Sequence, residues 1–237
     1  MAKEVRRHSV YAFRHAEAVP AKQMLMIRTD EFHSPYAMDR ARRLSEEGRE
    51  QAEILHGFLK DKKIIEAFAS PANRAYSTAA LAAGIPVQQV TILESLIYGD
   101  PSNSKETHFL NYLLDSGGDA LRAHRLTDLK RRGHTLKGTK VFDAWGKEAW
   151  DVLKSDIFKH LEGNFLVIGH GILLQEVFRT AISRGINGRN RADREEMAGN
   201  LLDMELSNGD GFCVTFEDKK PQSVELIPFP AKQEAAA

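Results

Sequence analysis

The sequence predicts an α/β protein, folded as a three-layer α/β/α sandwich with a largely parallel central sheet. Short apolar segments rich in strand-forming residues alternate along the chain with longer segments of helical periodicity. The segment Asn164–Ile168 contains an uninterrupted apolar run, which is typical of a central strand covered on both faces. Ligands of such sheets bind outside the carboxyl ends of the strands, so we look for chemistry there.

The first predicted strand is Ser9–Phe13, because it is short, apolar and bounded by charged residues on both sides. A helix is predicted from Ser45 onwards. Ser45 is a suitable N-cap, and the acidic residues that follow it suit the positive end of the helix dipole. The residues that share its apolar face are Ala52, Leu55 and Leu59.

The second predicted strand is Ile64–Ala69. Ser70 and Pro71 follow it as the expected N-cap and first residue of a helix that ends near Gly84. The remaining expected elements are a strand at 87–93, helices at 104–116, 143–162 and 172–182, and a hairpin of 212–216 with 224–227.

We interpret the whole chain, residues 1–237, as a single domain with inserted cap segments at about 19–44 and 117–142. The 33 basic and 33 acidic residues balance, so no global charge favours nucleic acid or an anionic membrane as a partner. The single cysteine excludes an internal disulfide framework. The N-terminus lacks a signal-peptide core and no apolar run spans a bilayer, so we expect a cytoplasmic protein.

Basic side chains follow three of the predicted strands. Arg14 and His15 end the first strand, Arg74 follows the second, and His170 ends the fourth. Arginine binds phosphate oxygens through a two-pronged fork, and histidine can act as a charged donor or as a nucleophile. Two helix N-termini at the same edge would add N–H donors. The sequence therefore predicts an anion pocket that needs no metal and no cofactor.

Four motifs in this order resemble those of the histidine phosphatase superfamily, which includes the phosphoglycerate mutases. Residues 13–17 (FRHAE) are similar to its Arg-His-Gly signature, and residues 44–52 (LSEEGREQA) to its first-helix motif. Residues 69–75 (ASPANRA) with Thr78 are similar to its Ser-Ser-Pro-x-x-Arg-Ala-x-x-Thr motif, and residues 167–171 (VIGHG) to its second-histidine motif.

The resemblance implies that His15 attacks phosphorus in line and forms a phosphohistidine, which water then hydrolyses. Arg14, Arg74 and His170 would bind the phosphate oxygens and stabilise the transition state. The nucleophilic histidine must be neutral at the attacking nitrogen, which is helped when its other nitrogen donates to a backbone carbonyl.

A carboxylic acid is also expected, because the leaving oxygen needs a proton. Glu94, just after the third strand, is similar in placement to the glutamate that serves mutase-like members, although it could equally be a surface glutamate. The other candidates are Asp100, Glu106 and Glu17.

Two departures from the family pattern favour a phosphatase. Ala16 replaces the usual glycine and is found in the short phosphohistidine-phosphatase branch, and Ala21 stands where mutase-like members have asparagine. The leading hypothesis is therefore a metal-independent phosphomonoester hydrolase of the histidine acid type, acting on a small-molecule or protein phosphomonoester. A phosphoglycerate mutase-like phosphotransferase and a non-catalytic phosphate-binding module are the alternatives.

The segment 121–140 carries seven basic residues and one acid, Asp128. It could recruit a substrate with several negative charges, or it could be a solvated surface segment. Oligomeric state is not indicated by any feature of the sequence.

Overall fold

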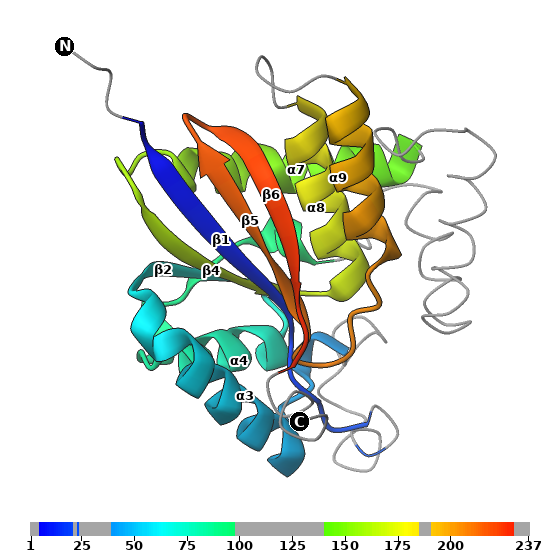
Figure 1. Ribbon diagram of the computed structural model, residues 1–237. Helices are drawn as coiled ribbons and strands as arrows, with labels where there is room; N and C mark the ends of the chain where they lie inside the picture. Colours follow the sequence, from blue (N-terminus) through cyan, green and yellow to red (C-terminus); the bar gives the residue numbers. More distant parts are fainter. Residues whose placement is uncertain (1–4, 21–22, 24–38, 98–139, 185–190, 230–237) are drawn as a thin grey trace, which may run out of the picture.

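The protein is built on a six-stranded mixed sheet, mostly parallel and flanked by helices (Figure 1). The computed structural model describes residues 5–20, 23, 39–97, 140–184 and 191–229. The strand order is β3-β2-β4-β1-β5-β6. The strands are β1 (Arg7–Arg14), β2 (Ile64–Ala69), β3 (Thr91–Ile92), β4 (Gly163–Gly169), β5 (Gly211–Glu217) and β6 (Lys220–Ile227).

Parallel pairing joins β1 to β4, β4 to β2 and β2 to β3, whereas β5 pairs antiparallel with both β1 and β6. The predicted α/β fold with a largely parallel sheet is confirmed, as is the C-terminal hairpin. Strands β1, β2 and β4 therefore end at the same edge of the sheet, where the sequence places its basic side chains.

Helices cover both faces of the sheet, which makes three layers (Figure 1). Helices α3 (Glu46–Leu59) and α4 (Asn73–Ala83) pack with the cluster that contains Phe13 and Leu166. Helices α7 (Lys140–Ile157), α8 (Gly171–Arg184) and α9 (Arg191–Asp203) pack with the cluster that contains Val10 and Val167. Successive side chains of β1 and β4 thus enter opposite cores, which explains their uninterrupted apolar runs. Three short 3-10 turns complete the described elements: Lys60–Lys62, Val87–Gln89 and Glu94–Leu96.

Helix α3 begins as predicted. The Ser45 hydroxyl accepts a hydrogen bond from the Gly48 amide at 3.0 Å, and the buried face is that of Ala52, Leu55 and Leu59. A Cβ at Gly48 would lie 2.0 Å from the main-chain oxygen of Glu17, so glycine permits a close approach between α3 and the loop after His15. The first-helix motif thereby packs against the loop that follows His15.

The prediction of a strand over 87–93 is wrong except at Thr91–Ile92. Pro86 starts a 3-10 turn in which the Gln89 amide donates to the Pro86 carbonyl at 2.9 Å. The side chain of Val87 is exposed there, so its apolar character does not reflect burial in the sheet.

Helix α4 begins at Asn73, later than predicted, with Ala72 as its N-cap. Ser70 and Pro71 precede the helix, and the Ser70 hydroxyl accepts from the Ala72 amide at 3.4 Å. Its predicted end is confirmed: Gly84 has a φ of 66°, in the left-handed region that favours glycine. Helix α9 was not predicted, because its first half is polar and its buried residues, Met197, Ala198, Leu201 and Leu202, lie only in the second half.

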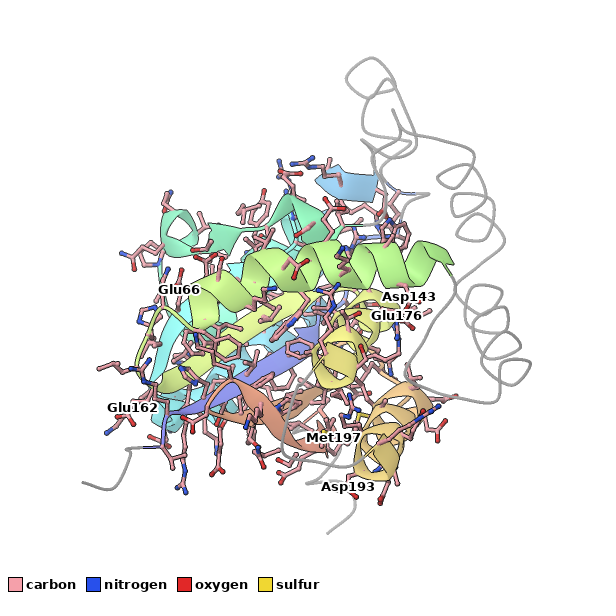
Figure 2. The ribbon with its side chains drawn as sticks, turned by 90° about the horizontal axis from the view of Figure 1, so that it is seen from above. Glu66, Asp143, Glu162, Glu176, Asp193 and Met197 are labelled. Atoms are coloured by element: carbon pink, nitrogen blue, oxygen red, sulfur yellow. The ribbon has the colours of Figure 1, made fainter. Side chains whose placement is uncertain are left out.

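A buried cluster of charges joins α7 to α8. Arg179 is 1% exposed and binds the Glu176 carboxylate at 2.6 Å and the Asp143 carboxylate. Figure 2 shows Asp143 of α7 and Glu176 of α8 close together beside the helix pair. Removing Arg179 would leave the buried Glu176 carboxylate without this counterion, so the cluster fixes how the two helices pack.

Several predictions lie outside the described residues. They are the helix at 104–116, the basic segment up to residue 139, the carboxylates Asp100 and Glu106, and the departure at Ala21. The single domain over 1–237 with its two insertions stays a prediction. No helix in the described part of the chain is long and apolar enough to cross a bilayer.

Candidate active site

The carboxyl ends of β1, β2 and β4 bring four of the predicted site residues to one edge of the sheet. The His15 amide donates to the Gly169 carbonyl at 2.9 Å, and the Ser70 amide donates to the Ile168 carbonyl at 3.0 Å. His15 and His170 lie next to each other, with ring centroids 5.2 Å apart and ring planes at 77°. The predicted convergence of the strand ends is therefore present, and it places two histidines in contact.

His15 is held in one tautomer by its two neighbours. Its Nδ1 lies 2.7 Å from the carbonyl oxygen of Ala16, which can only accept a hydrogen bond, so Nδ1 carries the proton. Its Nε2 accepts from the Nε–H of Arg74 at 3.0 Å. The lone pair of Nε2 therefore points toward the guanidinium of Arg74.

The electrostatics of the site keep His15 neutral. The side chain is buried, and this loss of solvent is the largest cause of a pKa lowered to about 3. The positive charge of Arg74 lowers the pKa further, and Arg14 and Arg42 act in the same direction. The hydrogen bond to the Ala16 carbonyl opposes them without offsetting them. A neutral imidazole with an unprotonated Nε2 is the form that a nucleophile requires.

His170 is buried at the end of β4, immediately before α8. The Ser70 hydroxyl lies 3.2 Å from its Nε2. Burial, then the charge of Arg74, lowers the pKa of His170 well below its ordinary value. Ser70 thus orients a site residue instead of capping α4, a role that the sequence did not reveal.

The two arginines approach the histidines from different elements. Arg74 projects from the first turn of α4 and is 4% exposed. Arg14 ends β1, and its Nη1 donates to the main-chain oxygen of Leu206 at 2.8 Å. Both arginines lower the pKa of both histidines, so their charges act on the same small volume. An anion at this edge would meet two guanidinium groups and two imidazoles.

Ala16 fits the site without strain. Its side chain is 1% exposed and packs with Leu44 and Ala52 of the first-helix motif. Its amide donates to the Thr78 hydroxyl at 3.1 Å, and that hydroxyl donates to the Arg74 carbonyl at 2.7 Å. The departure from glycine therefore adds a packing contact and leaves the loop bonded to the start of α4.

Of the carboxylates considered from the sequence, two are described. Glu94 follows β3 in a 3-10 turn, with a side chain 67% exposed and ion-paired to Arg40 at 2.9 Å. The Glu17 carboxylate accepts from the Ser45 hydroxyl at 2.8 Å, so it anchors the start of α3.

A carboxylate that the sequence did not single out is bonded directly to the site. Asp39 binds Arg74 through its side chain at 2.8 Å, and Arg42 also donates to it at 3.0 Å. Asp39 and Arg42 lie in the predicted cap segment at about 19–44. That segment has no regular hydrophobic period, so no local pattern in the sequence indicated their contact with the site. The concentration of arginines just before Leu44 was the available hint.

Within the described residues, no group of three or more His, Cys, Asp or Glu side chains is arranged to hold a metal ion. The groups gathered at the edge of the sheet are nitrogen donors and cations, which suit an anion. What the arrangement can do chemically is bind a phosphoryl group and offer it a neutral imidazole nitrogen.

A model of the histidine phosphatase superfamily (branch 1) matches residues 10–218 of the chain, which is most of its length. The chain belongs to the histidine phosphatase superfamily. A comparison with curated protein sequences found no significant match.

Solved structures with the same fold include members with several activities. The chain is similar to a phosphoserine phosphatase mutant from Entamoeba histolytica in complex with phosphoserine, with a TM-score of 0.53 and 15% identity over 95% of this chain and 98% of that one. It is similar to phosphoglycerate mutase from Bacillus anthracis, with a TM-score of 0.54 and 18% identity over 94% and 93% of the two chains. It is also similar to a mycobacterial glucosyl-3-phosphoglycerate phosphatase, with a TM-score of 0.52 and 15% identity over 94% and 98%.

These likenesses confirm the fold of this histidine phosphatase superfamily member. Membership of the superfamily supports a phosphatase or mutase-like activity toward phosphorylated compounds.

Proposed function

We propose that this member of the superfamily is a metal-independent phosphomonoester hydrolase that works through a phosphohistidine at His15. The observation that carries the proposal is the state of His15: its Nδ1 proton is held by the Ala16 carbonyl, and its Nε2 faces Arg74. Neutrality at that nitrogen is enforced by burial and by the neighbouring arginines.

The reaction follows from these contacts. When Arg14, Arg74 and His170 bind the phosphate oxygens, the Nε–H of Arg74 gives up its bond to His15 and frees the Nε2 lone pair. Nε2 then attacks phosphorus as the leaving oxygen departs. The bond from nitrogen to phosphorus makes the imidazole cationic, and the Ala16 carbonyl stabilises the Nδ1 proton of that form. Water then attacks the phosphohistidine, releases inorganic phosphate and restores the neutral imidazole.

We assign protonation of the leaving oxygen to Glu94. It lies after β3, whose carboxyl end is on the same edge as β2, and its partner Arg40 is the neighbour of Asp39 in the chain. An acid matters most for poor leaving groups, so Glu94→Gln is expected to slow hydrolysis of alkyl phosphates about 100-fold and of p-nitrophenyl phosphate only a few-fold. Equal effects on both substrate types would reject Glu94 as the acid.

The central experiment measures phosphate release from a panel of phosphomonoesters in the presence of a chelator. The wild type is compared with His15→Ala and with the matched control His160→Ala, which changes a histidine at the opposite end of β4. Activity in the wild type and control that is lost in His15→Ala, with circular dichroism unchanged, is the expected result. Activity that survives in His15→Ala or disappears in chelator contradicts the mechanism.

The same panel separates the alternatives. Isomerisation of phosphoglycerates would indicate the mutase-like phosphotransferase, which the residues at positions 16 and 21 disfavour. Phosphate binding without turnover of any substrate would indicate a phosphate-binding module.

The phosphohistidine itself is tested by rapid quenching with a substrate labelled on its phosphate. We expect acid-labile, base-stable label on the wild-type protein and none on His15→Ala. The ranking of substrates would distinguish small molecules from phosphoproteins.

A further inference from the structure

The guanidinium of Arg74 is already engaged by an anion that belongs to the protein itself. Its Nη1 donates to the main-chain oxygen of Asp39 at 2.5 Å, and its Nη2 donates to the Asp39 carboxylate at 2.8 Å. These two nitrogens form the fork with which arginine binds phosphate oxygens. A phosphate that uses this fork must compete with Asp39.

A second arginine shares the same carboxylate. Arg42 donates from Nη1 to the other oxygen of Asp39 at 3.0 Å, and its Nε donates to the Val19 carbonyl at 2.9 Å. The bond to Val19 fixes the guanidinium independently of Asp39. Arg42 also contributes to the lowered pKa values of His15 and His170, so its charge lies near both imidazoles.

The exposed fractions of the Arg74 and Asp39 side chains show from which side a substrate could reach the Arg74 guanidinium. The Arg74 side chain is 5% exposed, whereas that of Asp39 is 48% exposed. The carboxylate therefore lies on the outer side of a buried guanidinium. It can leave toward solvent by rotation of the side chain, which frees Nη2 of Arg74 while the main-chain oxygen of Asp39 remains on Nη1.

We propose that Asp39 is an internal substitute for the substrate phosphate: it occupies the anion site between Arg74 and Arg42 in the free protein, and a bound phosphate displaces it and gains Arg42 as a further ligand. This inference rests on the proposed function, because it takes Arg74 to be a phosphate ligand. It assigns a binding role to Arg42 and a competing role to Asp39.

The exchange of one anion for another has a chemical consequence. A phosphomonoester dianion carries more charge and more acceptor oxygens than a carboxylate, so it can replace Asp39 between two arginines. A phosphodiester or a carboxylate ligand carries a single charge and gains little over Asp39. Burial alone raises the pKa of Asp39, but Arg74 and Arg42 outweigh it and hold that pKa below its ordinary value, so the competitor stays charged at neutral pH. The site thereby favours monoester dianions.

The test is calorimetric titration of the full chain with inorganic phosphate at low ionic strength, which needs no turnover. Asp39→Asn removes the competing charge and is expected to bind phosphate about tenfold more tightly than the wild type, a change of the size seen for partly buried charge pairs. Glu50→Gln, which removes an exposed charge from α3, is the matched control and is expected to leave the affinity unchanged. If Asp39→Asn does not fold, Asp39→Ser serves the same purpose.

Arg42 is tested in the background that lacks the competitor. Arg42→Met in the Asp39→Asn protein is expected to weaken phosphate binding at least about tenfold, because it removes a charged ligand of the phosphate. Unchanged or weaker binding in Asp39→Asn overturns the competing role of Asp39, and no loss in the double variant overturns the role of Arg42. Failure of the proposed function is distinguished by Arg74→Met: if that variant binds phosphate as well as the wild type, the phosphate site itself is misplaced.

Discussion

Replacing His15 with glutamine is expected to change how the stability of the protein depends on pH. His15 has a pKa of about 3 in the folded protein, against an ordinary value of 6.5 that applies to the unfolded chain. Between these values the unfolded state binds one proton more than the folded state. The free energy of unfolding therefore falls as the pH drops from about 6.5 toward 3, by about 1.4 kcal/mol per pH unit for this one group.

Glutamine does not titrate, so the variant lacks this contribution. Between pH 7 and pH 5 the wild type is expected to lose about 2 kcal/mol more than His15→Gln does. His170 also has a lowered pKa, but burial and Arg74 are larger causes of it than His15 is, so most of the contribution of His170 persists in the variant.

The assay is urea unfolding followed by circular dichroism at pH 7, 6 and 5, at constant ionic strength. His15→Asn serves as the control, because a second non-titrating side chain should give the same pH dependence even if its absolute stability differs. Parallel curves for wild type and both variants would refute the argument that burial and Arg74 keep His15 neutral. A fall in kcat/KM below a pH of about 6.5, traced to protonation of His15, would refute it from the kinetic side.

Three further substitutions test the supports of the site. Gly48→Ala places a Cβ 2.0 Å from the Glu17 oxygen and should lower the free energy of unfolding by about 2–3 kcal/mol, measured by urea unfolding; a neutral effect would contradict the close approach. Ser70→Ala removes the hydroxyl 3.2 Å from His170 and should lower kcat about tenfold with little change in KM, whereas a change in KM alone would argue against an orienting role. Arg74→Lys keeps the charge but loses the fork, so kcat/KM should fall at least about 100-fold, and a fall of less than tenfold would show that charge alone suffices.

Much of the fold was predictable because it depends on local patterns. The strands β1, β2 and β4 are apolar runs with charged or turn-forming neighbours, and α3 has a serine cap and one apolar face. Where such patterns were weak, prediction failed. Residues 87–89 are exposed although Val87 is apolar, and the apolar face of α9 is confined to its second half, so the sequence did not indicate the structure of either segment.

The sequence by itself determined which four basic residues come together at the site. Arg14, His15, Arg74 and His170 follow three parallel strands, and the carboxyl ends of parallel strands must meet at one edge. Chain connectivity and strand direction are enough for that conclusion, and no side-chain geometry is needed.

Only the tertiary structure decided which partners these residues have. Ser70 could cap a helix or bond to His170, 100 residues away, and the sheet decides by placing the two strand ends side by side. The contact between Asp39 and Arg74 joins positions 35 residues apart. No local period encodes such contacts, because they depend on the path of the chain between the elements and on a buried charge finding its counterion once water is excluded.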